Sequence, residues 1–225
     1  MEWKLTNEFN QFIIQNKVVG FFEEPLKLKS GRLSYWYVNW RNLSQDVYLM
    51  DKLTDYLLSF VNYLNLDLTC FYGVPEGASK LGIITQLKWA KFHNDYGPYK
   101  YILPMGRGKP KEHGDPNDKF FIGKPKGKVV ILEDTTTTGG SLIDCIKNLE
   151  KFNVKVIAAI VLTDRNEYRD DKRTVNDVIA DYGIEYYAMS NAAEILPQLK
   201  PNKIIGEKIE EYFKKYGTKQ IFFEK

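Results

Sequence analysis

Two acids, four consecutive threonines, two glycines and a serine stand together at residues 133–141. Glycines allow a ligand to approach the backbone closely, and hydroxyl groups donate hydrogen bonds. A helix that begins here adds unpaired N–H groups and a partial positive charge, which together favour a bound phosphate. Glu133 and Asp134 are better suited to accept hydrogen bonds from sugar hydroxyls. The stretch therefore predicts a ligand with a phosphate at one end and a diol nearby, such as a ribose 5-phosphate.

The neighbouring elements place this stretch at the end of a strand. Residues 128–134 form a continuous apolar run that ends in acids, as buried parallel strands do, and residues 139–152 have the apolar spacing of a helix. Ligands of open α/β sheets bind beyond the carboxyl ends of the strands. The alternative is a threonine-rich turn before a capped helix, which leaves the paired acids unexplained.

Strand-like and helix-like patterns alternate through the chain. Strands are expected at 68–75, 100–105, 128–134, 155–163 and 184–189. Helices are expected at 45–64, 78–92, 139–152, 173–182, 191–198 and 201–216. This alternation predicts an α/β fold with a largely parallel central sheet flanked by helices.

The two ends of the predicted order differ from its middle. A helix at 3–19 and two short strands within 26–41 predict a small N-terminal cap over residues 1–45, with the α/β core at 46–225. Residues 106–120 contain three glycines, two prolines and many charges. We expect them to form a long mobile loop, and long loops within compact domains are usually functional or disordered.

The acid pair followed by Thr-Thr-Gly-Gly-Ser resembles the phosphoribosyl diphosphate (PRPP) signature of type I phosphoribosyltransferases. The resemblance implies the fold of that family. It also implies a PRPP site composed of Glu133, Asp134, Thr135, Thr136, Thr137, Thr138, Gly139, Gly140 and Ser141. The loop after strand 68–75 would hold the diphosphate mainly through backbone N–H groups of Val74, Pro75, Glu76 and Gly77.

Three further segments resemble orotate phosphoribosyltransferases in particular. Residues 26–41 resemble the Lys-Ser-Gly-Arg-x-Ser element, residues 107–114 the mobile catalytic loop, and residues 164–167 the Asp-Arg-x-Glu element. The resemblance implies that Lys29 approaches the diphosphate and the base. It further implies that Tyr37 stacks on the base and that Arg165 meets the orotate carboxylate, with Thr137 assisting at the base.

The same resemblance implies a catalytic role for three residues of the loop. Arg107 and Lys111 would neutralise the departing diphosphate, and His113 would donate a proton or hydrogen bond to it. Mg²⁺ would be bound through PRPP and water, with no ligand directly from the protein. The family also implies a homodimer in which this loop reaches the neighbouring subunit.

Each of these residues has a simpler alternative. Lys29 is otherwise a surface lysine, and Tyr37 a core or interface aromatic. Arg165 is otherwise part of a structural ion pair with Asp164 or Glu167. Lys111 and His113 are otherwise solvated loop residues.

Two positions depart from the family pattern. Residue 108 is a glycine where a second basic residue often follows the loop arginine, and Glu76 stands where some members carry lysine. Diphosphate binding is therefore expected to depend more on Lys29, Arg107 and Lys111.

Composition limits the remaining classes. The chain has 225 residues, 44% of them hydrophobic, and a net charge of +3. This weak basicity gives no reason to expect nucleic acid as a partner, and the sequence has no apolar run long enough to predict a membrane span. Cys70 and Cys145 are expected to be buried and unpaired, which favours a reducing compartment, the cytoplasm.

Two alternatives to an orotate enzyme remain on sequence grounds. One is a phosphoribosyltransferase for another base, such as uracil or a purine. The other is a PRPP-binding regulator that has the same fold and has lost catalysis.

Overall fold

A parallel four-stranded sheet forms the centre of the protein, and the computed structural model describes residues 3–115 and 119–223. The strand order is β3-β6-β7-β8, and every neighbouring pair is parallel. The four strands are β3 (Cys70–Gly73), β6 (Lys128–Thr136), β7 (Lys155–Asp164) and β8 (Glu185–Asn191). The predicted α/β class with a parallel sheet is confirmed.

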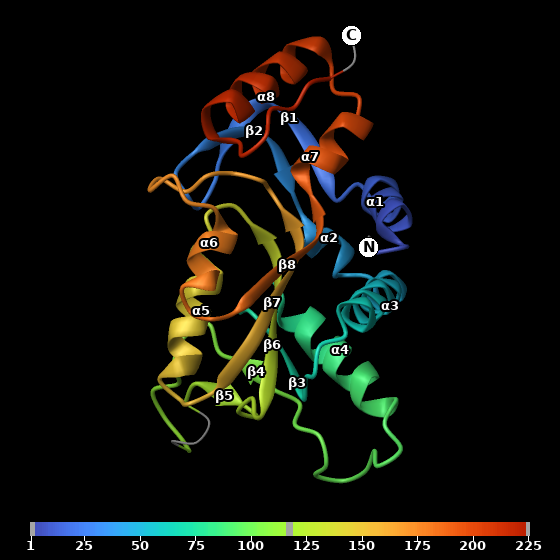
Figure 1. Ribbon diagram of the computed structural model, residues 1–225, viewed down its shortest axis with the longest axis vertical. Helices are drawn as coiled ribbons and strands as arrows, with labels where there is room; N and C mark the ends of the chain where they lie inside the picture. Colours follow the sequence, from blue (N-terminus) through green and yellow to red (C-terminus); the bar gives the residue numbers. More distant parts are fainter. Residues whose placement is uncertain (1–2, 116–118, 224–225) are drawn as a thin grey trace.

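Helices cover both faces of this sheet (Figure 1). On one side lie α5 (Gly140–Glu150) and α6 (Val175–Ala180), and on the other lie α3 (Val47–Leu64) and α4 (Ser79–Lys91). Successive side chains of β6 enter different cores: Val129 and Ile131 join the core under α5, whereas Val130 and Leu132 join the core under α3. This period of two explains why the strand is apolar along its whole length.

A hairpin and a C-terminal helix lie beyond the carboxyl ends of the central strands (Figure 1). The hairpin pairs β1 (Val19–Lys27) with β2 (Leu33–Val38), and α8 (Lys203–Tyr216) packs against it. Trp36 of β2 stacks on Phe213 of α8 with ring centroids 5.8 Å apart. Residues of the predicted cap thus pack against a helix from the other end of the chain, and the boundary at residue 45 stays a prediction.

The remaining short elements connect the hairpin and α8 to the central sheet. Helix α1 (Thr6–Gln15) packs against β8 and α7 (Ala192–Ile195). Helix α2 (Trp40–Leu43) follows the hairpin, and the 3₁₀ turn η2 (Leu196–Gln198) follows α7. The buried indole of Trp40 donates a hydrogen bond to Thr163 of β7 at 3.1 Å, which fixes α2 beside the end of the central sheet.

The strand predicted at 100–105 is wrong. Only β4 (Met105–Gly106) forms there; it pairs antiparallel with β5 (Phe121–Ile122) in a separate sheet, next to β3 but not hydrogen-bonded into the central sheet. The Gln86 side chain accepts a hydrogen bond from the backbone N–H of Phe71 at 2.9 Å and donates one to the carbonyl of Ile102 at 2.8 Å. A side chain thus bridges the gap in which a fifth strand would have paired directly with β3.

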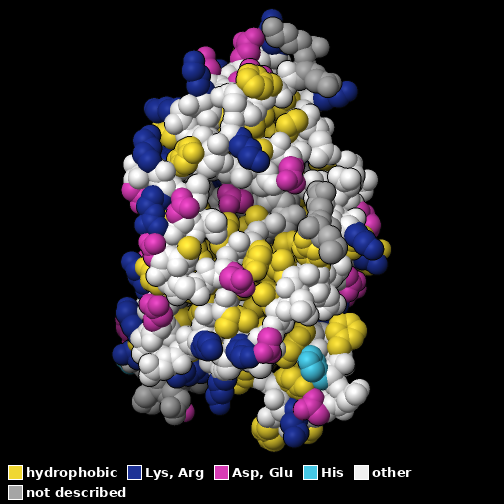
Figure 2. Space-filling view, in the orientation of Figure 1, with side chains coloured by type: hydrophobic (Ala, Val, Ile, Leu, Met, Phe, Trp, Pro, Cys, Tyr) yellow, Lys and Arg dark blue, Asp and Glu magenta, His cyan; other side chains and the backbone are white. Residues whose placement is uncertain are grey.

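The surface mixes charges of both signs. On the face shown in Figure 2, Lys and Arg side chains are interspersed with Asp and Glu, and hydrophobic side chains show in the middle of the face. Within residues 3–115 and 119–223, no helix is both long enough and apolar enough to cross a membrane. Cys70 and Cys145 are buried and unpaired, as predicted, and burial raises the pKa of the Cys70 thiol to about 11.

Candidate active site

The loop between β6 and α5 surrounds a cavity of about 220 Å³, which we call the threonine cavity. Gly139 begins the turn into α5 with φ 71°, a left-handed backbone that favours glycine. A Cβ atom on Gly139 would also lie 2.9 Å from a methyl group of Val175. The cavity is lined by Lys29, Ser30, Glu133, Thr135, Thr136, Thr137, Thr138, Gly139, Gly140, Ser141 and Leu142.

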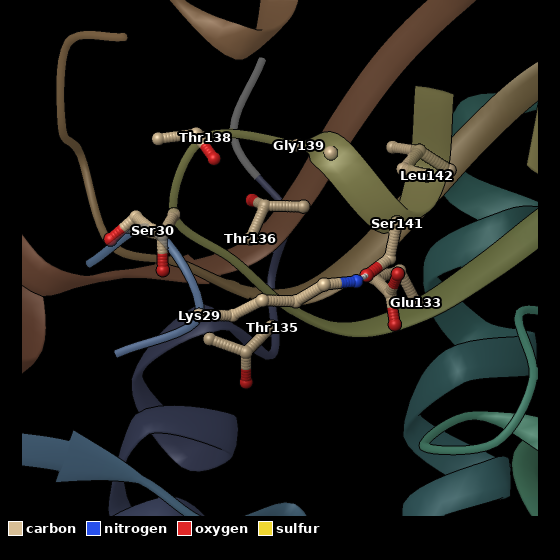
Figure 3. Close-up of a pocket in the computed structure, with 11 residues that line it drawn as sticks. Lys29, Ser30, Glu133, Thr135, Thr136, Thr138, Gly139, Ser141 and Leu142 are labelled. Atoms are coloured by element: carbon tan, nitrogen blue, oxygen red, sulfur yellow. Dashed lines mark hydrogen bonds between the residues drawn. The ribbon is translucent and has the colours of Figure 1, made fainter. Parts of the chain in front are cut away.

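Lys29 enters this site from the tight turn between β1 and β2. Its Nζ donates a hydrogen bond of 2.8 Å to Oγ of Ser141, and Figure 3 shows the side chain extending across the cavity towards Ser141 and Glu133. Residues 29 and 141 are 112 positions apart in the chain. Lys29 therefore contacts the predicted phosphate loop. It is not the isolated surface lysine of the alternative interpretation.

The four threonines do not all face the cavity in the same way. Thr136 is buried, and its hydroxyl pairs with the Tyr186 hydroxyl at 2.6 Å. Tyr186 in turn donates to Oδ2 of Asp164 at 2.8 Å. The sequence analysis assigned no role to Tyr186, which ties the loop to β7 and β8. Thr137 and Thr138 are half-buried.

The two acids at the end of β6 have different surroundings. Glu133 is only 5% exposed, and burial, followed by the negative charge of Asp134, raises the pKa of its carboxyl well above the usual value. Lys29 partly opposes this shift. Asp134 is half-buried and lies close to Gly77, where an added Cβ atom would come within 2.7 Å of Oδ2. The absence of a side chain at Gly77 therefore gives Asp134 its space.

A second cavity of about 390 Å³, which we call the acid cavity, lies next to the first. The residues that line both this cavity and the threonine cavity are Lys29, Glu133, Thr135, Thr137 and Ser141. Predicted base-binding and diphosphate-binding residues meet here. The lining is Leu28, Lys29, Tyr37, Val38, Arg41, Pro75, Glu76, Gly77, Glu133, Asp134, Thr135, Thr137, Ser141 and Arg165.

Arg165 is both a cavity residue and a member of a buried ion pair. Its side chain is 1% exposed, and its Nε donates to Oε1 of Glu167 at 2.8 Å. The guanidinium lies 3.7 Å from the centre of the Trp36 ring, so Trp36 is a core residue. The ion pair with Glu167 foreseen as the alternative thus exists. It does not remove Arg165 from the acid cavity, which it lines together with half-buried Tyr37.

The loop after β4 contributes unequally. Arg107 lines a third cavity of about 440 Å³, the loop cavity, together with Val74, Pro75, Lys29 and Ser141. Lys111 and His113 are exposed and line none of the three cavities. Residues 116–118 of the predicted mobile loop lie outside the described part of the chain.

The three cavities meet at the hydrogen bond between Lys29 and Ser141. The threonine cavity offers hydroxyls and the N-terminus of an eleven-residue helix, which suit a phosphate. The acid cavity offers carboxylates for hydroxyl groups and a buried guanidinium for an anion. One ligand with two anionic ends and a diol between them, placed beside a second anionic ligand, satisfies this arrangement.

Arg41 is a residue that sequence reasoning missed. It lies on α2, is exposed, and lines the acid cavity, as do the acids at positions 133 and 134. Its only signal in the sequence is a basic charge four positions after Tyr37. Glu167 was named only as an alternative ion-pair partner of Arg165, and Arg32 was given no role of its own; their contacts are described below.

Comparison with known proteins agrees with this geometry. The family model for the phosphoribosyl transferase domain matches residues 119–185. An orotate phosphoribosyltransferase of Rhodopseudomonas palustris is 31% identical over 195 residues, which cover 82% of this chain and 92% of the relative. One from Buchnera aphidicola is 27% identical over 207 residues, covering 90% and 94%. The solved orotate phosphoribosyltransferase of Francisella tularensis superimposes with a TM-score of 0.68 at 21% identity, covering 94% of this chain and 100% of that one.

Proposed function

The chain belongs to the orotate phosphoribosyltransferase family, and we propose that it transfers the 5-phosphoribosyl group of PRPP to orotate, giving orotidine 5′-monophosphate and diphosphate. The type I phosphoribosyltransferase fold agrees with the sequence expectation. The observation that carries the assignment to this chain is the meeting of the threonine cavity and the acid cavity at Lys29. This arrangement supports an anion cradle, a diol site and a buried arginine that serve one substrate pair.

We assign the ends of PRPP by charge. The 5-phosphate binds the loop at residues 137–141, where α5 begins. The ribose hydroxyls donate to Glu133 and Asp134, and the diphosphate lies along residues 74–77 with Lys29. Helix α5 stays fixed when PRPP binds, because the side chains of its inner face, Leu142, Ile146 and Leu149, are buried in the core.

Orotate occupies the acid cavity in this proposal. Its carboxylate pairs with Arg165, and its ring stacks on Tyr37, with Thr137 at its edge. Arginine binds a carboxylate bidentately, which fixes the plane of the base as well as its charge. The base nitrogen is thereby directed at the ribose carbon from which diphosphate leaves.

Charge on the leaving group determines the roles of the remaining residues. Arg107, which lines the loop cavity beside Lys29, neutralises the developing negative charge, and Lys111 and His113 do so when their loop closes. Closure also excludes water, which would otherwise hydrolyse the activated sugar. We propose that the loop acts across the interface of a homodimer and that the enzyme works in the cytoplasm.

We propose that Mg²⁺ is bound through the substrate. Within the described residues, no group of three or more His, Cys, Asp or Glu side chains could hold a metal by itself. Mg²⁺ usually keeps several waters and binds one or two carboxylates plus substrate phosphates. Asp134, the half-buried carboxylate of the acid cavity, would hold a water of such an ion. When bound, the ion would neutralise diphosphate charge.

A panel of bases tests this function against its nearest alternative. We expect PRPP- and Mg²⁺-dependent turnover of orotate and none of uracil or hypoxanthine, because only orotate offers a carboxylate to Arg165. Turnover of uracil or hypoxanthine without turnover of orotate would favour the enzyme for another base. Binding of PRPP without turnover of any base would favour the regulator.

A further inference from the structure

A buried ionic cluster stands behind the acid cavity and consists of Arg32, Arg165 and Glu167, which we call the buried triad. The side chains of Arg32, Arg165 and Glu167 are 6%, 1% and 0% exposed. Glu167 Oε1 accepts from Arg165 at 2.8 Å, while Oε2 accepts from Arg32 at 2.9 Å and from the Tyr212 hydroxyl at 2.8 Å. Both carboxylate oxygens are therefore occupied, and one contact comes from helix α8.

The charges of the buried triad balance only when the exposed Asp170 is included. Glu167 accepts from both guanidinium groups, and Asp170 also accepts from Arg32 at 2.8 Å. Asp170 is 90% exposed, so solvent screens its charge, and Glu167 is the buried carboxylate that contacts Arg165, the member that lines the acid cavity. An anion that enters the cavity beside Arg165 gains a charge-assisted contact with a guanidinium that Glu167 already orients.

Several groups hold the guanidinium of Arg165. Its Nε donates to Glu167, its Nη2 donates to Oγ of Ser34 at 3.0 Å, and its plane rests against the ring of Trp36. Its Nη1 makes a long contact of 3.5 Å to the Trp36 carbonyl, and the Tyr212 ring lies 5.9 Å from the guanidinium carbon. Of these groups, Glu167 is the one with a full negative charge, so its hydrogen bond to Nε is the strongest of the contacts that set the direction of Nη1.

We propose that Glu167 is a positioning residue for recognition of the base carboxylate and that Tyr212 of α8 holds it in place. This inference rests on the proposed function, because it takes the acid cavity as the orotate site. It gives the C-terminal helix a part in base recognition, although α8 itself lines neither the threonine cavity nor the acid cavity.

Two variants that conserve the charge of the triad test positioning separately from electrostatics. Glu167→Asp withdraws the carboxylate by one methylene, and we expect the orotate KM to rise about 10-fold or more, the effect of one charge-assisted hydrogen bond. Tyr212→Phe removes a single hydroxyl, and we expect a rise of about 3-fold or more. The PRPP KM should stay within about twofold in both, because the threonine cavity does not include these residues.

Tyr216→Phe is the matched control. It removes a hydroxyl one turn later on α8 and keeps the ring that stacks on Arg32 at 4.5 Å, so we expect both KM values to stay within about twofold. Thermal unfolding shows whether each variant is folded. If Glu167→Asp does not fold, Tyr212→Phe decides the question alone.

The outcomes separate this inference from the proposed function. Wild-type protein that does not turn over orotate would refute the function itself. If the wild type is active, the variants test Glu167. An orotate KM that is unchanged in the variants, or that rises no more than the PRPP KM, would overturn the positioning role of Glu167 and leave the function intact.

Discussion

Replacing Glu133 by glutamine is expected to stabilise the fold and to weaken the binding of PRPP. Glu133 is only 5% exposed, and burial together with the charge of Asp134 raises the pKa of its carboxyl well above the ordinary 4.5. Ionised Glu133 is therefore a buried charge that the backbone N–H of Asp134 and the charge of Lys29 compensate only in part. In the proposed function this charge binds the ribose hydroxyls, and its burial makes the fold less stable.

The direction of the pH effect follows from the raised pKa. The protonated form contributes stability that is complete below the unfolded value of about 4.5 and is lost as pH rises through the higher folded value. Glutamine has no proton to lose, so the variant avoids this loss. The variant should exceed the wild type by about 1–3 kcal/mol at pH 8, the scale of a buried polar group left without a full partner. That difference corresponds to roughly 3–10 °C in Tm for a chain of this size.

Scanning calorimetry at pH 8 and pH 4 measures this effect, and steady-state kinetics measures its functional counterpart. The advantage in Tm should shrink towards zero at pH 4. The PRPP KM should rise about 10-fold or more, since one charge-assisted hydrogen bond is lost. Glu150→Gln, on the exposed side of α5, is the control and should change neither quantity. A variant no more stable than the wild type at pH 8 would refute the reasoning.

Other perturbations test different parts of the site. Lys111→Ala should lower kcat by about 100-fold, the scale of a single transition-state group, with the fold unchanged because the side chain is exposed; an unchanged kcat in single-turnover experiments would exclude Lys111 from the mechanism. Arg41→Ala should raise the PRPP KM by about threefold or more, because it removes a cation of the acid cavity that would contact the diphosphate. Steady-state titration of PRPP measures this, and an unchanged KM would exclude that contact. Native protein should react slowly with thiol reagents, because burial raises the pKa values of Cys70 and Cys145 to about 11 and 12, whereas rapid labelling would contradict their burial.

Much of the sheet could be predicted because each strand carries its own signal. The run at 128–134 is apolar on both faces because β6 lies between two cores, and the spacing in 139–152 reflects one buried side of α5. The strand predicted at 100–105 does not form, and a side chain of α4, Gln86, hydrogen-bonds both the N–H of Phe71 in β3 and the carbonyl of Ile102. No pattern local to residues 100–105 records that contact.

The sequence predicted the individual segments of the candidate site better than the contacts between them. The motif at 133–141 and the lysine at 29 are local signals. The structure brings them into contact, with Nζ of Lys29 2.8 Å from Oγ of Ser141. The pairing of Glu167 with two arginines and Tyr212 depends on where α8 packs, which its amphipathic pattern does not specify. The positions of Lys111 and His113 likewise depend on the arrangement of the loop, and their catalytic roles stay predictions.

A crystal structure of the protein with orotate, PRPP and Mg²⁺, or with a non-reactive PRPP analogue, tests the central claim most directly. The account predicts the 5-phosphate on the backbone N–H groups of residues 137–141, the ribose hydroxyls on Glu133 and Asp134, and the orotate carboxylate on Arg165. An orotate bound away from Arg165, or a 5-phosphate outside the loop between β6 and α5, would contradict it.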